Sequence, residues 1–218
     1  MVDIEEVKEI IESFPGSYRF LYTELESISS PYIFVGLNPG GNDDDPSDMY
    51  IENGNAFTNE DWGQKGPNPL QHQVRAFFQQ IATNLGKELI PMMSKEWMIS
   101  NYVFYRSSKW STMAAKNGHL DNCKSIWRKI FSATPPKIIV CNGHDTYKNM
   151  KEILKGWTQE SEVKSTSAWD GPHISVLKKG DMRCLIVGFA HLSRFKVITR
   201  AANITSMNTV YQIIKEFQ

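Results

Sequence analysis

Cysteine is scarce in this chain and shows no pattern. The three cysteines, Cys123, Cys141 and Cys184, have no paired spacing. They cannot form a four-cysteine zinc or iron–sulfur site, and an odd, scattered set is typical of a reduced, intracellular protein. Long hydrophobic runs are missing too, since none approaches the roughly 20 residues that a membrane helix needs. The first residues are acidic rather than basic and apolar, so we expect no signal peptide. These absences predict a cytoplasmic protein.

An excess of either charge is also missing, because 24 lysine and arginine residues balance 24 aspartate and glutamate residues. Zero formal net charge gives no general attraction to nucleic acid, so a nucleic-acid surface would have to come from local basic positions. The candidates for such a surface are Lys109, Lys116, Arg128 and Lys129. No internal repeat or low-complexity linker divides the 218 residues. We expect one domain covering residues 1–218, acting as a monomer without membrane contact.

Short apolar runs alternate with segments of helical periodicity along the chain. Apolar spacing predicts helices at 4–14, 74–85, 120–131 and 206–217, and a further helix at about 145–154 after an Asn-Gly turn. Strands are predicted at 32–35, 97–105 and 137–141, and a hairpin-like pair at 174–177 and 183–187. This alternation predicts an α/β fold, a three-layer α/β/α sandwich with a mainly parallel central sheet.

A long polar stretch, rich in Gly, Asn, Asp and Pro, follows the first predicted strand and extends to residue 69. It opens with Gly36-Leu37-Asn38-Pro39-Gly40-Gly41. Glycine lets a ligand approach the main chain, and proline makes the turn rigid. Asn38 stands at the carboxyl end of a strand, where open α/β sheets usually bind ligands. So long a segment without regular structure is usually functional, so we expect a site to begin here.

Three further strand-end segments accompany this turn, at residues 100–103, 142–144 and 188–193. The segment 36–41 resembles the Gly-x-Asn-Pro-Gly motif of the mismatch-specific and single-strand-selective uracil-DNA glycosylases. The segment Gly188-Phe189-Ala190-His191-Leu192-Ser193 resembles the His-Pro-Ser motif of the same superfamily, with Leu192 where proline is usual. Residues 100–108 are similar to the Thr-Asn-x-Val-x-x-Arg-Thr-Thr stretch of thymine-DNA glycosylases, and 54–57 to the segment with the base-stacking phenylalanine. On these motifs the chain resembles the uracil-DNA glycosylase superfamily over roughly residues 30–217.

The resemblance implies a monofunctional DNA glycosylase that flips out a pyrimidine and hydrolyses its N-glycosidic bond. It implies that Asn38 holds the attacking water and that His191 donates a hydrogen bond to the pyrimidine O2. Asn101 would read the Watson–Crick edge of the base, and Phe57 would stack on it. No lysine nucleophile is evident, so we expect an abasic product without strand scission. This chemistry requires no metal or organic cofactor.

The remaining motif residues would line the base pocket or contact the DNA. By resemblance, the pocket residues are Gly36, Leu37, Pro39, Gly40 and Gly41, and the DNA-contacting residues are Ser193, Arg194 and Phe195. Arg194 and Phe195 could form an arm that enters the duplex, or Phe195 could be a core contact beside a surface charge.

Gly40 departs from the most uracil-restricted members of the superfamily, which place a bulky tyrosine there. That tyrosine excludes substituents at the pyrimidine C5, and a glycine leaves the space open. We therefore expect tolerance of 5-substituted bases, including the sugars that some phages attach to cytosine. Whether the role is DNA repair or defence against modified phage DNA is left open by the sequence.

Each assignment also has a purely structural interpretation. Asn38 and its glycines could form only a tight turn, His191 could be a satisfied half-buried histidine, and Asn101 or Phe57 could cap or anchor a loop. His144 is expected to be a helix-start residue. The run Asp43-Asp44-Asp45 is expected to be solvated rather than to bind metal. His72, His119 and His173 have no ligand spacing and receive no role.

Two other functions compete with a glycosylase. One is a binding module with the same fold and a degraded site, which recognises modified DNA or a protein partner; the zero net charge and Leu192 favour it. The other is a nucleotide hydrolase or transferase that uses residues 36–41 as a phosphate cradle. A cradle needs Lys-Ser or Lys-Thr after its glycines, whereas Asn42-Asp43-Asp44 follows here and would repel phosphate.

Overall fold

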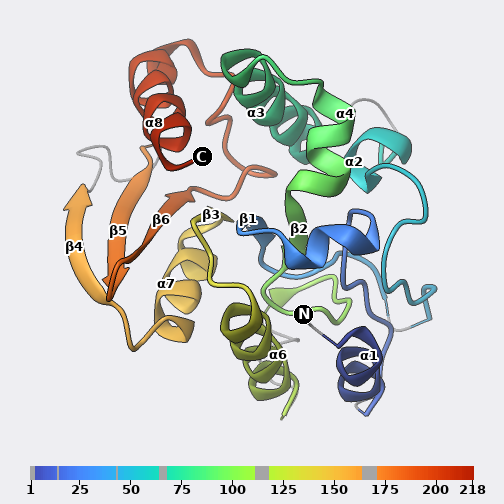
Figure 1. Cartoon of the computed structure of the whole chain (residues 1–218). Helices are drawn as coiled ribbons and strands as arrows, with labels where there is room; N and C mark the ends of the chain where they lie inside the picture. The colour runs from blue at the N-terminus through green and yellow to red at the C-terminus, as the bar shows by residue number, and fades with distance from the viewer. Residues whose placement is uncertain (1–2, 14, 43, 64–67, 111–117, 164–170) are drawn as a thin grey trace.

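The computed structural model describes residues 3–13, 15–42, 44–63, 68–110, 118–163 and 171–218. A six-stranded sheet forms the centre of the chain, between two groups of helices (Figure 1). In spatial order its strands are β2 (Met98–Asn101), β1 (Tyr32–Gly36), β3 (Ile138–Asn142), β6 (Met182–Phe189), β5 (His173–Lys179) and β4 (Thr158–Val163). The first four are parallel to one another; β5 pairs antiparallel with β6, and β4 pairs antiparallel with β5. The carboxyl ends of β2, β1, β3 and β6 therefore meet at one edge of the sheet.

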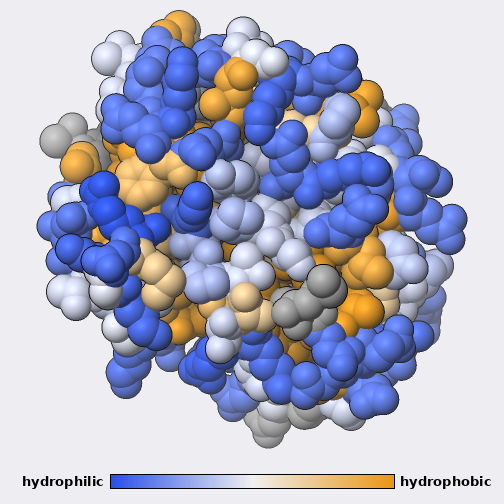
Figure 2. Space-filling view, viewed as in Figure 1, coloured by the Kyte–Doolittle hydropathy of each residue, from blue (hydrophilic) through white to orange (hydrophobic). Residues whose placement is uncertain are grey.

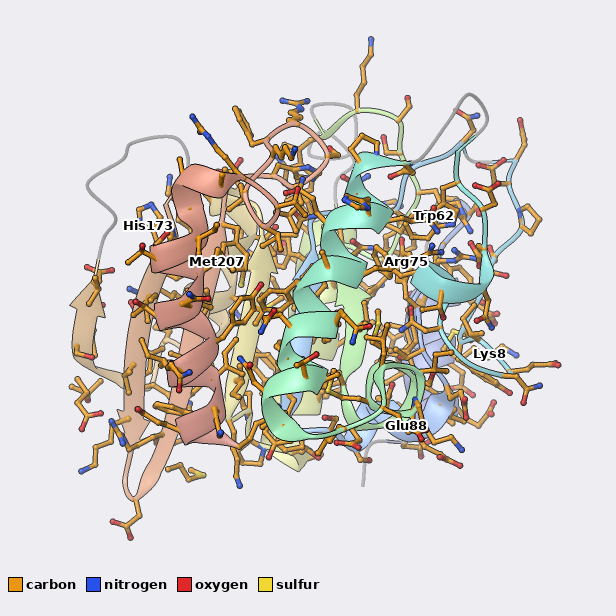
Figure 3. The ribbon with its side chains drawn as sticks, turned by 90° about the horizontal axis from the view of Figure 1, so that it is seen from above. Lys8, Trp62, Arg75, Glu88, His173 and Met207 are labelled. Carbon is orange, nitrogen blue, oxygen red and sulfur yellow. The ribbon has the colours of Figure 1, made fainter. Side chains whose placement is uncertain are left out.

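Helices cover both faces of this sheet. One face carries α1 (Ile4–Glu12), α6 (His119–Ala133) and α7 (His144–Ile153), and the other carries α3 (Pro69–Leu85) and α8 (Ile204–Phe217). The shorter elements are α2 (Ala56–Asn59), α4 (Leu89–Pro91), the 3-10 turns η1 (Leu25–Ser29) and η3 (Ala201–Asn203), and the π-helical turn η2 (Met92–Glu96). In Figure 3 helices α3 and α8 lie side by side, and the rings of Phe77 and Tyr211 are 5.7 Å apart between them.

The alternation of side chains along the strands divides the core in two. Ile33 and Val35 of β1 belong to the cluster under α1, α6 and α7, whereas Phe34 belongs to the cluster under α3 and α8. Strand β3 repeats the pattern with Ile139 and Val140 on opposite faces. Near-continuous apolar strands buried on both faces are what a parallel sheet between helical layers requires. The predicted α/β class with a mainly parallel sheet is therefore confirmed.

Most predicted elements are present, with three differences. The strand predicted at 97–105 ends at Asn101, because residues 102–105 leave the sheet and bury their side chains below it. Strand β4 was not predicted, since its six residues are mostly exposed and polar and give no apolar alternation. The long polar stretch contains one turn of helix, α2, which begins at Ala56.

The outer surface is mainly polar. Figure 2 shows hydrophilic side chains over most of the face seen in Figure 1, with hydrophobic ones dispersed among them. The exposed large hydrophobic side chains come from separate elements: Tyr50, Ile90, Val163, Met182 and Ile204. No helix in the described ranges combines the length and apolar character needed to cross a membrane.

Candidate functional site

A cavity of about 680 Å³ lies at the carboxyl edge of the parallel strands. Its walls come from the ends of β1, β2, β3 and β6 and from two long connections, residues 36–48 and 57–70. Among the lining residues are eight that the sequence nominated: Gly36, Leu37, Asn38, Gly40, Gly41, Phe57, Asn101 and His191. Pro39 is buried and does not line the cavity, but its carbonyl accepts a hydrogen bond from the Asn38 side chain. In Figure 3 Trp62, another lining residue, lies in the upper half of the view, and Glu88 lies in the lower half.

Asn38 is half-buried, and its carboxamide is held in one orientation. Its Nδ2 donates hydrogen bonds to the carbonyls of Pro39 and Ser107, both at 2.9 Å. Within the described residues, no group donates to its Oδ1. Because a carboxamide oxygen has two acceptor sites, this arrangement leaves an acceptor that can bind a water molecule.

The backbone around Asn38 is fixed by the segment that follows β2. The amide of Val103 donates to the Leu37 carbonyl at 3.0 Å, and the amide of Ser107 donates to the Pro39 carbonyl at 3.0 Å. Residues 102–107 thus continue the β1–β2 pairing beyond the sheet, as an irregular connection rather than a strand. The predicted motifs at 36–41 and 100–108 hold one another in place through main-chain hydrogen bonds.

His191 reaches the cavity from the turn after β6. Its Nδ1 lies 2.8 Å from the Ser193 hydroxyl. Burial and the nearby charge of Arg194 lower the pKa of His191 below its usual value. The ring is therefore neutral at neutral pH. Among the described residues its Nε2 has no hydrogen-bond partner, so this atom is available to a ligand.

Leu192 occupies the proline position of the motif for a structural reason. Its backbone amide donates to the Oδ1 of Asn142 at 2.7 Å, and proline has no N–H for this bond. Asn142 ends β3 and is 2% exposed, and its Nδ2 is left as a donor on a residue that lines the cavity. Leu192 therefore anchors the His191 turn to the neighbouring strand instead of weakening it.

Gln73 of α3 is a second anchor of the same turn. Its side-chain Nε2 donates to the carbonyls of Leu192 and Phe195, and its Oε1 accepts from the amides of Val197 and Ile198 at 2.7 and 3.0 Å. The side chain is 3% exposed, so all of its hydrogen-bonding capacity is spent on residues 192–198. The sequence gives no signal for this role, because Gln73 sits within an ordinary helical pattern.

Asn101 and Gly36 face one another across the β1–β2 pair, at matched positions of the register. A Cβ on Gly36 would lie 2.1 Å from the Asn101 Oδ1, so any other residue there would force the Asn101 carboxamide to move. The Asn101 Nδ2 donates to the Tyr22 hydroxyl at 2.9 Å. The Asn101 oxygen and the second N–H of its amide remain for a ligand.

Phe57 belongs to an aromatic wall. Its ring centroid lies 4.7 Å from that of Trp62, 5.5 Å from that of Tyr22 and 6.4 Å from that of Phe34. Asn55 caps α2 by accepting a hydrogen bond from the Phe57 amide at 2.8 Å, which fixes the ring's position. Phe57 is only 4% exposed, so it is both a loop anchor and part of the cavity lining.

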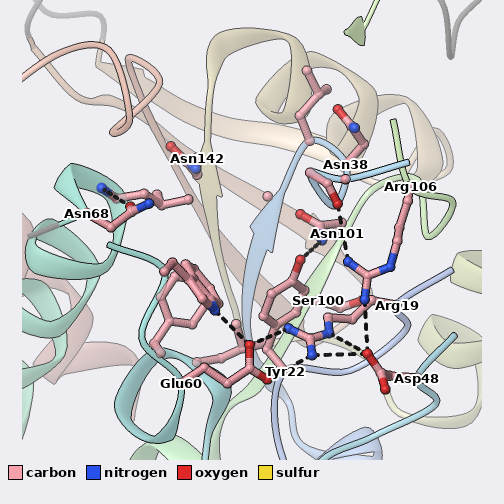
Figure 4. Close-up of a pocket in the computed structure, with 18 of the residues that line it drawn as sticks. Arg19, Tyr22, Asn38, Asp48, Glu60, Asn68, Ser100, Asn101, Arg106 and Asn142 are labelled. Carbon is pink, nitrogen blue, oxygen red and sulfur yellow. Dashed lines mark hydrogen bonds and ion pairs between the residues drawn. The ribbon is translucent and has the colours of Figure 1, made fainter. Parts of the chain in front are cut away.

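Four charged residues close one end of the cavity, and none of them was predicted to have a role. Arg19 forms a two-bond ion pair with Glu60, at 2.8 and 2.9 Å, and contacts Asp48 at 3.0 Å. Arg106 also contacts Asp48, at 3.0 Å (Figure 4). Burial alone would raise the pKa of Glu60, but hydrogen bonds from Arg19 and Trp62 lower it below its usual value. Only Arg106 lay inside a recognised motif; the other three lie far apart in sequence.

A second groove of about 870 Å³ adjoins the cavity. Asn38, Gly40 and His191 line both. The groove also contains three predicted DNA-contacting residues and two other nominated ones: Ser193, Arg194, Phe195, Lys109 and His144. Ser193 and Arg194 are exposed, whereas Phe195 is half-buried and packs against the core under α3 and α8. Of the two predictions for Phe195, an arm that enters the duplex or a core contact, the structure shows the core contact.

The other nominated residues lie elsewhere. Lys129 forms an ion pair with Glu6 at 2.7 Å and lines neither cavity. Lys116 and Asp43 fall outside the described residues. His144 begins α7, as predicted, and its ring lies 4.6 Å from that of His173. In the part of the chain that the structure describes, no three His, Cys, Asp or Glu side chains are grouped as metal ligands.

No protein-family model and no curated protein matches this chain. Functional inference therefore depends on the residues and geometry described above.

Proposed function

We propose that this protein is a monofunctional DNA glycosylase that excises uracil or a 5-substituted pyrimidine, including the hypermodified cytosines of phage DNA, and leaves an abasic site. One observation carries the proposal. Asn38 with a free Oδ1 and His191 with a free Nε2 come from distant parts of the sequence and line the same cavity. The cavity is within the 300–1,000 Å³ range of ligand pockets, and a flipped base is a ligand of that kind.

In the proposed reaction the bond between C1′ of the deoxyribose and N1 of the pyrimidine breaks, and both bonding electrons leave with the base. A water molecule held by Asn38 Oδ1 adds its oxygen to C1′ and releases a proton to solvent. The base departs as an anion and takes up a proton afterwards. An amide cannot accept the proton itself, so Asn38 positions the water while the electron-poor sugar drives its attack.

His191 would stabilise the departing base. When the Ser193 hydroxyl donates to Nδ1, the neutral ring carries its proton on Nε2, which can then donate to the pyrimidine O2. The lowered pKa keeps the ring neutral, and a Ser193 hydroxyl that donates to Nδ1 would select this tautomer. A single preorganised donor to a developing oxyanion is worth about 3 kcal/mol in comparable sites.

The other cavity residues would bind the base. Asn101 presents an acceptor, through its Oδ1, to an N–H of the Watson–Crick edge, and Asn142 presents a donor. Phe57 and its aromatic neighbours offer an apolar surface for the ring. The adjoining groove, with Arg194 and Lys109, would take the phosphates that flank the flipped nucleotide.

The direct test uses oligonucleotides that carry one uracil, 5-hydroxymethylcytosine or glucosylated hydroxymethylcytosine, single-stranded and duplex. After incubation, alkali converts abasic sites into strand breaks. We expect breaks with the wild-type protein, none above background with Asn38→Ala or His191→Ala, and wild-type cleavage with His72→Ala. His72 is an exposed histidine that lines neither cavity.

Binding of the same oligonucleotides without any cleavage would contradict the proposal and support the alternative of a DNA-binding module. Turnover of free nucleotides with no effect on DNA would support the phosphate-cradle alternative instead. The anchoring of Leu192 to Asn142 removes one of the arguments for a degraded site.

A further inference from the structure

The charged end of the cavity has no part in the bond-breaking steps described above. It consists of Arg19, Asp48, Glu60 and Arg106, which we call the charged wall. Ion pairs satisfy most of its hydrogen-bonding groups, yet all four side chains line the cavity. The two arginine side chains are only 12% exposed, and the carboxylates that they pair with are about one-third exposed. Removing such charges from water costs free energy. Binding of a ligand would account for that cost.

The orientation of the base in the cavity follows from the positions of O2 and C5 on the pyrimidine ring. In a pyrimidine ring C5 lies opposite C2, the atom that bears O2. If O2 meets His191, C5 points away from His191 and from Asn142, which holds the His191 turn. Figure 4 shows Asn142 on one side of the cavity, and Asn38 and Arg106 on the other. The C5 substituent would therefore extend toward the side that carries Arg106.

Gly40 is the opening to that side. No heavy atom lies within 4 Å of the position where a Gly40 Cβ would be, so the space beside it is open. The Gly40 carbonyl accepts a hydrogen bond from Arg106 NH1 at 3.2 Å. A substituent that passes Gly40 meets the Arg106 guanidinium and, beyond it, Asp48 and Arg19 (Figure 4).

The hydrogen bonds of the charged wall determine what kind of substituent fits. Arg106 uses three of its five N–H groups, on Pro46, Gly40 and Asp48, and has two left as donors. In Asp48 the Oδ2 atom accepts from both arginines, while Oδ1 has no partner among the described residues. Free donors on Arg106 and a free acceptor on Asp48 thus lie close together. A hydroxyl group can accept a hydrogen bond from the first and donate one to the second.

The charge balance disfavours charged substituents. Two arginines face Asp48, Glu60 and the nearby Asp45, which also lines the cavity. An anionic group would meet this carboxylate excess, and a cationic group beside Arg106 would be repelled by its guanidinium group. A neutral, hydroxyl-rich group meets neither penalty.

We propose that the charged wall determines substrate specificity by binding a neutral substituent with several hydroxyl groups, such as a hexose, attached at C5 of the flipped pyrimidine. This inference rests on the proposed glycosylase function and adds to it a substrate class and four specificity residues. Arg106 and Asp48 would contact the hydroxyls directly, and Arg19 and Glu60 would hold them in place.

The test measures kcat/KM for release of cytosine bases that carry different C5 groups: 5-hydroxymethyl, glucosyl-oxymethyl, 5-carboxyl and 5-aminomethyl. For the wild-type protein we expect the glucosylated base to exceed both charged bases by at least 100-fold. We expect Arg106→Lys, which keeps the charge and loses the planar fork, to lower the ratio of glucosylated to hydroxymethyl turnover at least tenfold. Asp48→Asn should lower the same ratio.

The matched control is Glu160→Gln, which removes a carboxylate from an exposed ion pair with Arg183 outside both cavities and should leave the ratio unchanged. If a variant folds poorly, equilibrium binding of the same oligonucleotides to the Asn38→Ala protein supplies the order of preference instead. A preference for the carboxyl or aminomethyl base, or a ratio that Arg106→Lys does not alter, would overturn the inference while leaving the glycosylase function intact. Release of no base from any oligonucleotide would overturn both.

Discussion

Asn38 and Asn101 carry the same side chain at the ends of neighbouring strands, and their surroundings give them different chemistry. Asn38 spends its Nδ2 on two carbonyls and keeps a half-buried oxygen for water. Asn101 donates one Nδ2 hydrogen to Tyr22, and its oxygen lies beside Gly36. Both carboxamides keep an oxygen acceptor, and they differ in what surrounds that oxygen. In the proposed reaction the Asn38 oxygen would hold the water and the Asn101 oxygen would read the base edge.

Substitution of Gly40 by tyrosine tests whether its open space admits C5 substituents. A tyrosine side chain would extend from a position with no heavy atom within 4 Å, so it can be accommodated by the fold while filling the cavity. We expect Gly40→Tyr to lower kcat/KM for both bases, and the fold-loss for glucosylated cytosine to be more than ten times the fold-loss for uracil. Gly156→Tyr, in similarly open space outside both cavities, is the control. Equal losses on the two bases would show that Gly40 does not govern access.

The pH dependence of activity reports on His191. The ring must be neutral for Nδ1 to accept a hydrogen bond from the Ser193 hydroxyl, and burial lowers its pKa below the usual 6.5. As pH falls, kcat/KM should therefore decline with an apparent pKa below 6.5. In Ser193→Ala the neutral ring loses a hydrogen bond worth about 1 kcal/mol. We expect the acid limb to move to higher pH and kcat to fall several-fold; an acid limb in the same place would contradict this role of Ser193.

At the scale of elements, the sequence predicted the strands and helices whose apolar pattern is strong. The strands Tyr32–Gly36 and Ile138–Asn142 are buried on both faces. A strand in that position needs a continuous run of apolar residues, and such a run can be recognised in the sequence. Strand β4 was missed because an exposed edge needs only main-chain pairing with β5. The irregular connection after β2 was mistaken for strand because its buried aromatic residues resemble a strand pattern.

The candidate site was predictable only in part for the same physical reason. Asn38 and His191 stand next to strand ends within short motifs, so local sequence marks them. Arg19, Asp48 and Glu60 are brought together by the fold from separate segments, and no spacing in the sequence relates them. Charge networks assembled by tertiary contacts leave no local pattern to read.

The turn that carries His191 depends on Gln73 of the facing helix. Gln73→Leu would preserve the size of the side chain and leave two backbone amides and two carbonyls without their partner. Each unsatisfied buried group costs about 1–3 kcal/mol, so for these four groups we expect the free energy of unfolding in urea to fall by about 4 kcal/mol or more. Gln79→Leu on the exposed face of α3 is the control and should change stability by less than about 0.5 kcal/mol. Equal stability of the two variants would contradict the anchoring role.

At the scale of the whole molecule, the balanced charge limits how the protein would bind DNA in the proposed function. With no basic excess, phosphate contacts are restricted to a few side chains of the groove, including Lys109 and Arg194. Each neutralised phosphate contributes about −0.9 to the slope of log Kobs against log salt concentration. We expect a shallow slope, no steeper than about −3, which Arg194→Ala should reduce in magnitude by about 1. A slope steeper than about −6 would require a basic surface that the described residues do not show.

Asn38 and His191 act, in this account, on the two partners of one glycosidic bond. Single-turnover cleavage of a 5-substituted pyrimidine oligonucleotide by the wild-type protein, each single alanine variant and the double variant measures this directly. We predict a loss of about 10²–10³ in rate for each single variant, a double variant near the uncatalysed rate, and oligonucleotide affinity within about tenfold of wild type throughout. Cleavage at the wild-type rate by either single variant would contradict the account.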